Sequence, residues 1–175
     1  MIDQSKFNPK TVYVIYIAAT AEKVWQALTD PELSPQYFHG CRLEIEPMVG
    51  GQFVVRFPDG RINVRGEVVE WSPPRRLVTS WGVDWVPELR EFPPCLVGYD
   101  IEPAGESVKL TMMESYSWDP PDALLSGGRS GWPAILSSVK SVLETGKPLV
   151  IKLDPPKGMM ELVKELAAAR PWLKV

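Results

Sequence analysis

The chain has 175 residues, of which 45% are apolar and 23% charged, and its 22 acidic and 19 basic side chains give a net charge of -3. This composition predicts a soluble folded domain whose core needs no disulfide or structural metal. Lysine and arginine are interspersed with acidic residues along the chain and form no basic stripe, so nucleic acid is not an expected partner. No apolar run is long enough to span a membrane, and residues 1–10 form no signal segment, so we expect a cytoplasmic protein.

The two cysteines, Cys41 and Cys95, stand far apart and lack the paired spacing of zinc or thioredoxin-type motifs. We expect both to be buried free thiols, because cysteine is among the most buried residue types. A disulfide between them is the alternative. No residue pattern predicts a metal site or a cofactor.

Residues 11–18, TVYVIYIA, are rich in β-branched and aromatic side chains and predict a strand. The alternation places three side chains on one side of it: Val12, Val14 and Tyr16. Thr20 then offers a side-chain oxygen as a helix cap, which predicts a short helix ending near Pro31. A second short, broken helix is expected over residues 31–38.

From Cys41 to Tyr116, short apolar segments are divided by turn residues, which is typical of an antiparallel sheet. The expected strands are residues 42–46, 52–57, 62–71, 76–81, 95–103 and 108–116. In the second of these, alternation places Phe53, Val55 and Phe57 on a single face. Residues 82–94 break the alternation and predict a long loop, of the kind that often serves as a lid or binding segment.

The strand over residues 108–116 places Glu114 in line with an apolar row. The row consists of Val108, Leu110, Met112 and Tyr116. An ionised carboxylate on such a face costs several kcal/mol unless it is paired or stays protonated. Glu114 is therefore a candidate ligand anchor or general base, and the alternative is a strand that frays, where Glu114 meets water or an arginine.

Residues 117–131 contain two prolines and three glycines and predict a linker with at most one helical turn. The longest helix is expected over residues 132–145, with Pro133 in its first turn and Gly146 at its end. Its apolar stripe consists of Trp132, Ile135, Leu136, Val139, Val142 and Leu143. A further helix over residues 158–170 packs either on the same chain, which we expect, or on a second copy in a homodimer.

A strand, two short helices, six antiparallel strands and a long helix form the element order of the helix-grip fold, an α+β fold. Residues 50–81, GGQFVVRFPDGRINVRGEVVEWSPPRRLVTSW, resemble the central strands of the START-like SRPBCC superfamily. They most resemble the branch of homologues of the activator of the heat-shock-protein ATPase (AHSA-like). Residues 18–32 and 131–146 resemble that branch's opening strand-to-helix segment and its closing helix.

The resemblance predicts a domain over residues 1–146 and leaves residues 147–175 as a C-terminal extension with a short helix. It implies a curved sheet and a long helix that enclose a cavity for a small hydrophobic or amphipathic molecule. We expect the cavity walls to be Phe53, Val55, Phe57, Trp81, Met112, Trp132 and Leu136, with Glu114 as the polar anchor. For Trp81 and Trp132 the alternative is simple filling of the core.

The chain departs from the branch at two places. Tyr37-Phe38-His39 stands where members often carry a Trp pair, and Glu114 stands near a position where they often have a histidine. Ligand chemistry known for other members is therefore not carried over to this chain.

Three functions are compatible with the sequence, and the first is preferred because fold analogy alone is weak support for a function. The first is a cavity protein that binds a small hydrophobic ligand without catalysis. The second is a co-chaperone-like module that docks on a heat-shock ATPase in a stress response. The third is a cyclase or hydrolase whose acid and base groups would come from Glu114, His39, Tyr99 and Tyr116.

Overall fold

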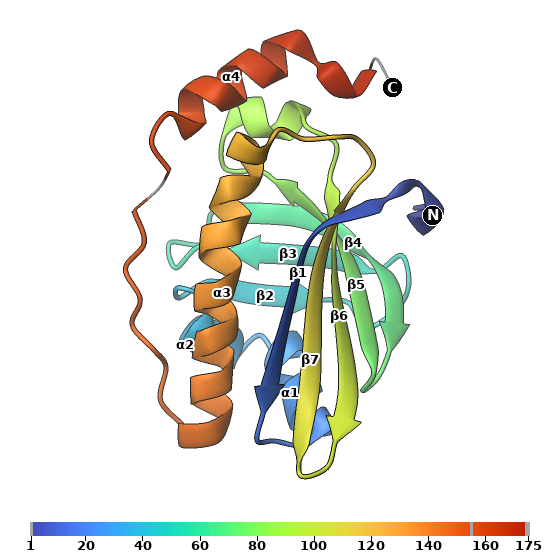
Figure 1. Cartoon of the computed structure of the whole chain (residues 1–175), viewed down its shortest axis with the longest axis vertical. Coiled ribbons are helices and arrows are strands. Elements are labelled where there is room, and N and C mark those ends of the chain that lie inside the picture. Colours follow the sequence, from blue (N-terminus) through green and yellow to red (C-terminus); the bar gives the residue numbers. More distant parts are fainter. Residues whose placement is uncertain (1, 155, 174–175) are drawn as a thin grey trace.

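A seven-stranded antiparallel sheet curves around the long helix α3 in the computed structural model, which describes residues 2–154 and 156–173 (Figure 1). The strands are β1 (Asn8–Ile17), β2 (Arg42–Ile45), β3 (Gln52–Arg56), β4 (Ile62–Ser72), β5 (Arg76–Val83), β6 (Cys95–Ala104) and β7 (Ser107–Tyr116). The helices are α1 (Ala21–Thr29), α2 (Ser34–Tyr37), α3 (Asp122–Thr145) and α4 (Met159–Ala169), with the 3₁₀ turns η1 (Gln4–Lys6), η2 (Pro87–Glu91) and η3 (Pro171–Leu173). The predicted α+β, helix-grip architecture is confirmed.

The strand order in the sheet is β1-β7-β6-β5-β4-β3-β2, so the first strand of the chain pairs with the last. In that pairing Thr11 lies opposite Glu114, and Ile17 lies opposite Val108. The inward-facing side chains of β7 are buried, as the alternation predicted: Val108, Leu110, Met112 and Glu114. The outward-facing residues of β1 named above, Val12, Val14 and Tyr16, are about half exposed.

Helix α1 begins where the sequence predicted. The Thr20 hydroxyl oxygen accepts a hydrogen bond from the Lys23 backbone N–H at 3.3 Å, which satisfies one of the free donors of the first turn. The second short helix is present as α2, and its first residue is buried. The Ser34 hydroxyl oxygen accepts the Leu43 backbone N–H at 2.9 Å and so ties α2 to the start of β2.

The linker predicted over residues 117–131 is wrong from residue 122 onward, because α3 already begins at Asp122. Pro133 therefore lies inside the helix rather than in its first turn, and the Arg129 carbonyl loses its usual N–H partner. Glycine and proline disfavour a helix, but Leu125, in the added turns, is only 3% exposed. Burial of apolar side chains outweighs the unfavourable propensity of these residues.

The predicted face of β3 is correct for two of its three residues. Phe53 and Val55 are 2% and 0% exposed and belong to the main core. The strand ends at Arg56, after a register shift against β4, so Phe57 lies outside it. The Phe57 ring instead contacts Trp85, with ring centroids 6.4 Å apart.

Residues 147–154, which we call the strap, run back along α3 toward α4 (Figure 1). The Ser141 hydroxyl donates to the Lys147 carbonyl at 2.7 Å, and the Leu149 backbone N–H donates to the Ser138 hydroxyl oxygen at 3.2 Å. Helix α4 then packs on η2 and on α3. Across the described residues, no helix is both long enough and apolar enough to traverse a lipid bilayer.

Candidate functional site

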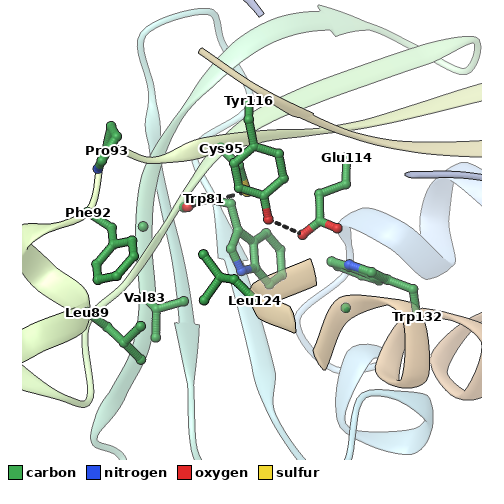
Figure 2. A pocket seen from close by; sticks show the side chains of 12 residues that line it. Trp81, Val83, Leu89, Phe92, Pro93, Cys95, Glu114, Tyr116, Leu124 and Trp132 are labelled. Carbon is green, nitrogen blue, oxygen red and sulfur yellow. Dashed lines mark hydrogen bonds between the residues drawn. The ribbon is translucent and has the colours of Figure 1, made fainter. Parts of the chain in front are cut away.

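A cavity of about 250 Å³ lies between one end of the sheet, the N-terminal half of α3 and the η2 region (Figure 2). Strands β5, β6 and β7 form one wall, α3 a second and the residues around η2 a third. The lining residues are Trp81, Gly82, Val83, Leu89, Phe92, Pro93, Cys95, Glu114, Tyr116, Leu124, Gly128 and Trp132. Glu114 is the one charged residue among these, so the cavity combines apolar walls with a single carboxylate.

Hydrogen bonds from two neutral hydroxyls hold the Glu114 carboxylate in place. Thr11, its cross-strand neighbour on β1, donates to Oε2 at 3.0 Å. Tyr116, two residues further along β7, donates to Oε1 at 3.1 Å. Glu114 is only 7% exposed, and no lysine or arginine of residues 2–154 and 156–173 forms an ion pair with it. The carboxylate is thus buried and hydrogen-bonded, without a counter-charge from the described chain.

Helix α3 approaches the carboxylate closely at Gly128. A Cβ at this position would lie 2.8 Å from Glu114 Oε2, which is closer than real Cβ contacts. The absence of a side chain at residue 128 therefore provides the space in which the carboxylate sits. This packing also explains why a glycine lies within a helix at the cavity.

Aromatic rings surround the carboxylate. The Trp81 and Trp132 rings meet edge to face, with centroids 5.2 Å apart and planes inclined at 66°. In Figure 2 the Tyr116 hydroxyl and the Glu114 carboxylate point toward each other, and the Trp132 ring lies beside the carboxylate. Trp81 also packs on Phe53, at 5.4 Å between centroids, so the cavity wall continues directly into the core.

The Cys95 thiol and the Tyr116 hydroxyl, which neighbour Glu114, stay protonated at physiological pH. Burial, together with the Glu114 charge, raises the pKa of the Cys95 thiol well above its ordinary value. Burial also raises the pKa of Tyr116, with further contributions from Cys95 and Glu114. The Cys95 thiol donates to the Trp81 carbonyl at 3.7 Å. Cys95 is therefore a poor nucleophile, because the thiolate is the reactive form.

The cavity wall around η2 is held by the C-terminal extension. Phe92, which lines the cavity, packs on Trp172 with ring centroids 4.7 Å apart. Trp118 completes a cluster of three rings, 5.4 Å from Trp172 and 6.1 Å from Phe92. We call Phe92, Trp118 and Trp172 the Trp172 cluster. An ion pair of 2.6 Å between Arg170 Nη2 and Glu91 Oε2 lies next to it.

Three of the eight residues expected around the ligand meet at the cavity: Trp81, Glu114 and Trp132. Phe53, Val55, Met112 and Leu136 belong to the adjacent core and do not line the cavity. Phe57 does not line the cavity either; it packs at the margin of the core and against Trp85. The core side chains fill most of the space between the sheet and α3, so the open space is confined to the end nearest η2.

Several lining residues were not identified from the sequence. Leu89, Phe92 and Pro93 come from the stretch that the sequence predicted as a lid or binding loop, so the segment was identified but its side chains were not. Leu124 and Gly128 lie in the part of α3 that was predicted as a linker. A correct helix start would have shown that Leu124 and Gly128 share one helix face with Trp132.

The other acid and base candidates do not join this site. His39 is exposed and has a positive φ of 52°, and Tyr99 is buried in the core away from the cavity. Only Glu114 and Tyr116 come together, through the hydrogen bond described above. Both cysteines are buried free thiols, as predicted. Within the described ranges, no group of three or more His, Cys, Asp or Glu side chains is arranged to hold a metal ion.

Solved structures with a similar fold include proteins from several contexts. DynU16, from the dynemicin biosynthetic locus, is 27% identical with a TM-score of 0.66 over 82% of this chain, which spans 49% of DynU16. CalU16 from Micromonospora echinospora is 21% identical with a TM-score of 0.62, over 93% of this chain and 86% of CalU16. Aha1 from Colwellia psychrerythraea, solved as a dimer in solution, is 20% identical with a TM-score of 0.64, over 78% of this chain and 96% of its own.

No curated protein matches the chain. The family model described as "Activator of Hsp90 ATPase homolog 1-like protein" matches residues 18–144, which include every strand after β1 and nearly all of α3. The match covers most of the chain and agrees with the fold of the structural neighbours. The chain therefore belongs to the family of Activator of Hsp90 ATPase homolog 1-like proteins.

Proposed function

We propose that this protein binds a small, largely apolar molecule in the cavity beside η2, with Glu114 as the polar anchor. The observation that supports this most is a carboxylate, 7% exposed, at the wall of an otherwise uncharged cavity. Buried carboxylates are costly, and a position facing open space lets a ligand contribute the missing interaction. The volume of about 250 Å³ lies just below the range of about 300–1,000 Å³ for typical ligand pockets. The ligand is therefore small.

We also propose that residues 147–175 form part of this binding unit. The Trp172 cluster and the Arg170–Glu91 ion pair attach the extension to the segment that carries Leu89 and Phe92. Packing on this segment restricts its motion and so keeps the third cavity wall in place. The extension acts through η2 rather than by touching the ligand.

A cavity-filling variant tests the binding proposal. Leu124→Trp adds a large ring to the lining, and Leu149→Trp makes the same change on the strap, where Leu149 is 48% exposed. The neutral probe is neopentylbenzene, followed by chemical-shift changes of the indole N–H signals, with Trp→Phe variants to assign Trp81 and Trp132. We expect binding to the unaltered protein and to Leu149→Trp, and its loss in Leu124→Trp.

Native mass spectrometry of gently purified protein, with extraction of any bound compound, provides an independent readout. A stoichiometric small molecule lost in Leu124→Trp would identify the ligand. Binding of the probe that is equally strong in Leu124→Trp would contradict the proposal, because the probe would then occupy another place.

Family membership favours a second function, a module that docks on an Hsp90-type ATPase. The half-exposed apolar row on β1, Val12, Val14 and Tyr16, is a surface that such a partner could cover. The test is the rate of ATP hydrolysis by Hsp90 with and without this protein, and with Val14→Lys. Stimulation that Val14→Lys abolishes would support docking through this row, whereas an unchanged rate and no complex would contradict it.

A further inference from the structure

We propose that the ligand of the η2 cavity is a small organic cation, an ammonium group that carries an apolar substituent. This inference rests on the proposed binding function and specifies its ligand class. Two features of the cavity carry it, the charge at its wall and the nature of the surfaces around that charge. Glu114 and Trp132 are buried, and Trp81, Tyr116 and Phe92 are partly buried.

The first feature is a negative charge that the described chain leaves unbalanced. Glu114 accepts hydrogen bonds from Thr11 and Tyr116, which are both neutral hydroxyls. Arg129, the arginine of α3, pairs instead with Asp122 at 3.0 Å, and its side chain is 44% exposed. A carboxylate has about four lone-pair sites, so two hydrogen bonds leave it able to accept from a ligand. A cation would supply the missing charge, and one that carries an N–H would also donate a hydrogen bond to the carboxylate.

The second feature is the set of aromatic faces around that carboxylate. Trp81, Trp132 and Tyr116 all line the cavity with Glu114, and Phe92 lines it from the side of η2. The faces of aromatic rings attract cations, most strongly for tryptophan, and attract them more when water is excluded. Aromatic rings around one carboxylate form the kind of cage that recognises ammonium groups. An anionic ligand is disfavoured by both features.

Neutral ligands are the main alternative, because the same rings also offer apolar contact. A neutral apolar molecule would cover Glu114 without compensating its charge, which costs free energy. A cation of the same shape would compensate that charge. The two classes are therefore separated by comparing ligands that differ only in charge.

Benzyltrimethylammonium and neopentylbenzene form such a pair, because a nitrogen cation replaces a carbon atom in the same skeleton. Each is titrated into the full chain, and the indole N–H signals of Trp81 and Trp132 are followed. We expect the cation to bind about tenfold or more tightly than its neutral counterpart. The third probe, 3-phenylpropionate, carries a negative charge and is expected to bind most weakly.

The variant Glu114→Gln keeps the shape of the side chain and removes its charge. We expect it to weaken binding of the cation about tenfold and to change binding of neopentylbenzene less than about threefold. Glu106→Gln is the matched control, since Glu106 is an exposed carboxylate in the β6–β7 turn. It makes the same change in net charge away from the cavity and is expected to leave both affinities unaltered.

The outcomes separate this inference from the binding proposal. Equal binding of the two isosteres, or tighter binding of the neutral or anionic probe, would overturn the cation inference and leave the cavity as a binding site. Failure of all three probes to bind would contradict the cavity function itself. The comparison of the three probes on the unaltered protein distinguishes a cationic from a neutral ligand even if Glu114→Gln does not fold, because that comparison needs no variant.

Discussion

Gly128 of α3 lies against the carboxylate of Glu114, so that a Cβ on residue 128 would come within 2.8 Å of Oε2. The carboxylate accepts hydrogen bonds from Thr11 and Tyr116 and also faces the open cavity. A methyl group here would displace Oε2 and break its hydrogen bond from Thr11. The glycine thus shapes the cavity wall around Glu114 although it carries no functional group.

Gly128→Ala is therefore expected to weaken binding of benzyltrimethylammonium by about tenfold, while stability changes little. The helix gains about 1 kcal/mol from replacing glycine, and this offsets the displaced hydrogen bond. Gly131→Ala is the control, because it lies in the same helix and a methyl group there would meet no atom within 4 Å. Titration and urea unfolding of both variants provide the measurement. Equal affinities in the two variants would show that residue 128 does not shape the site.

Variants of Leu136 and Leu89 distinguish the role of the core from that of the cavity. Leu136 is 2% exposed and packs in the core, whereas Leu89 lines the cavity. Leu136→Ala is expected to lower the free energy of unfolding by about 2–5 kcal/mol, because it leaves a void, with little effect on probe affinity. Leu89→Ala is expected to reduce neopentylbenzene affinity with a smaller loss of stability. Reversal of these two patterns, in urea unfolding and titration, would place the ligand deeper in the fold.

Trp172 is expected to hold the η2 segment rather than the whole fold. It stacks near Phe92 and Trp118, and each aromatic pair contributes about 0.5–1.5 kcal/mol beyond apolar burial. Trp172→Ala should therefore speed hydrogen exchange in α4 and η2, with little change in the sheet. Leu173→Ala is the neighbouring control, since Leu173 is 71% exposed. Unchanged exchange at η2 in Trp172→Ala would contradict the role assigned to the extension.

Stability is expected to fall at alkaline pH. Burial and the Glu114 charge raise the pKa of Cys95 and Tyr99 in the folded chain, and burial also raises that of Tyr116. The unfolded chain loses these protons from about pH 9 to 10, near the ordinary values of 9.0 and 10.0, while the folded chain keeps them. Stability is therefore fully present below about pH 9 and decreases above it, by up to about 1.4 kcal/mol per pH unit for each group.

Urea midpoints measured from pH 8 to pH 11 check this expectation. The variant Tyr99→Phe removes one of the three groups and should show a shallower decrease than the unaltered chain. A midpoint that stays constant up to pH 11 would mean that these protons are lost equally in both states.

The sequence predicted the sheet well because turns and alternation are local signals. Glu114 was singled out as a candidate site residue for the same reason, since a charge in an apolar row is visible without tertiary information. The start of α3 was missed because its glycines and Pro133 disfavour a helix locally, and this is compensated by burial of side chains such as Leu125 in the folded chain. Phe57 was misplaced because a register shift at Arg56 cannot be read from alternation.

The division between core and cavity depends on volumes that only the folded chain defines. The inward faces of the sheet and of α3 carry both core residues and cavity residues; the core residues include Val55, Met112 and Leu136. Alternation therefore could not distinguish filled space from open space. Trp81 and Trp132 both line the cavity, although neither stands at the end of its element, since β5 continues to Val83 and α3 begins at Asp122.

The pairing of β1 with β7 joins Asn8 to Tyr116 and Ile17 to Val108. Contacts between residues so distant in sequence close large loops and make folding slow. During synthesis, β1 is made first and has no partner strand until β7, the last strand, has been synthesised. The hydrogen bond from Thr11 to Glu114 belongs to this long-range pairing, so the cavity wall around Glu114 depends on a contact that joins the two ends of the sheet-forming segment.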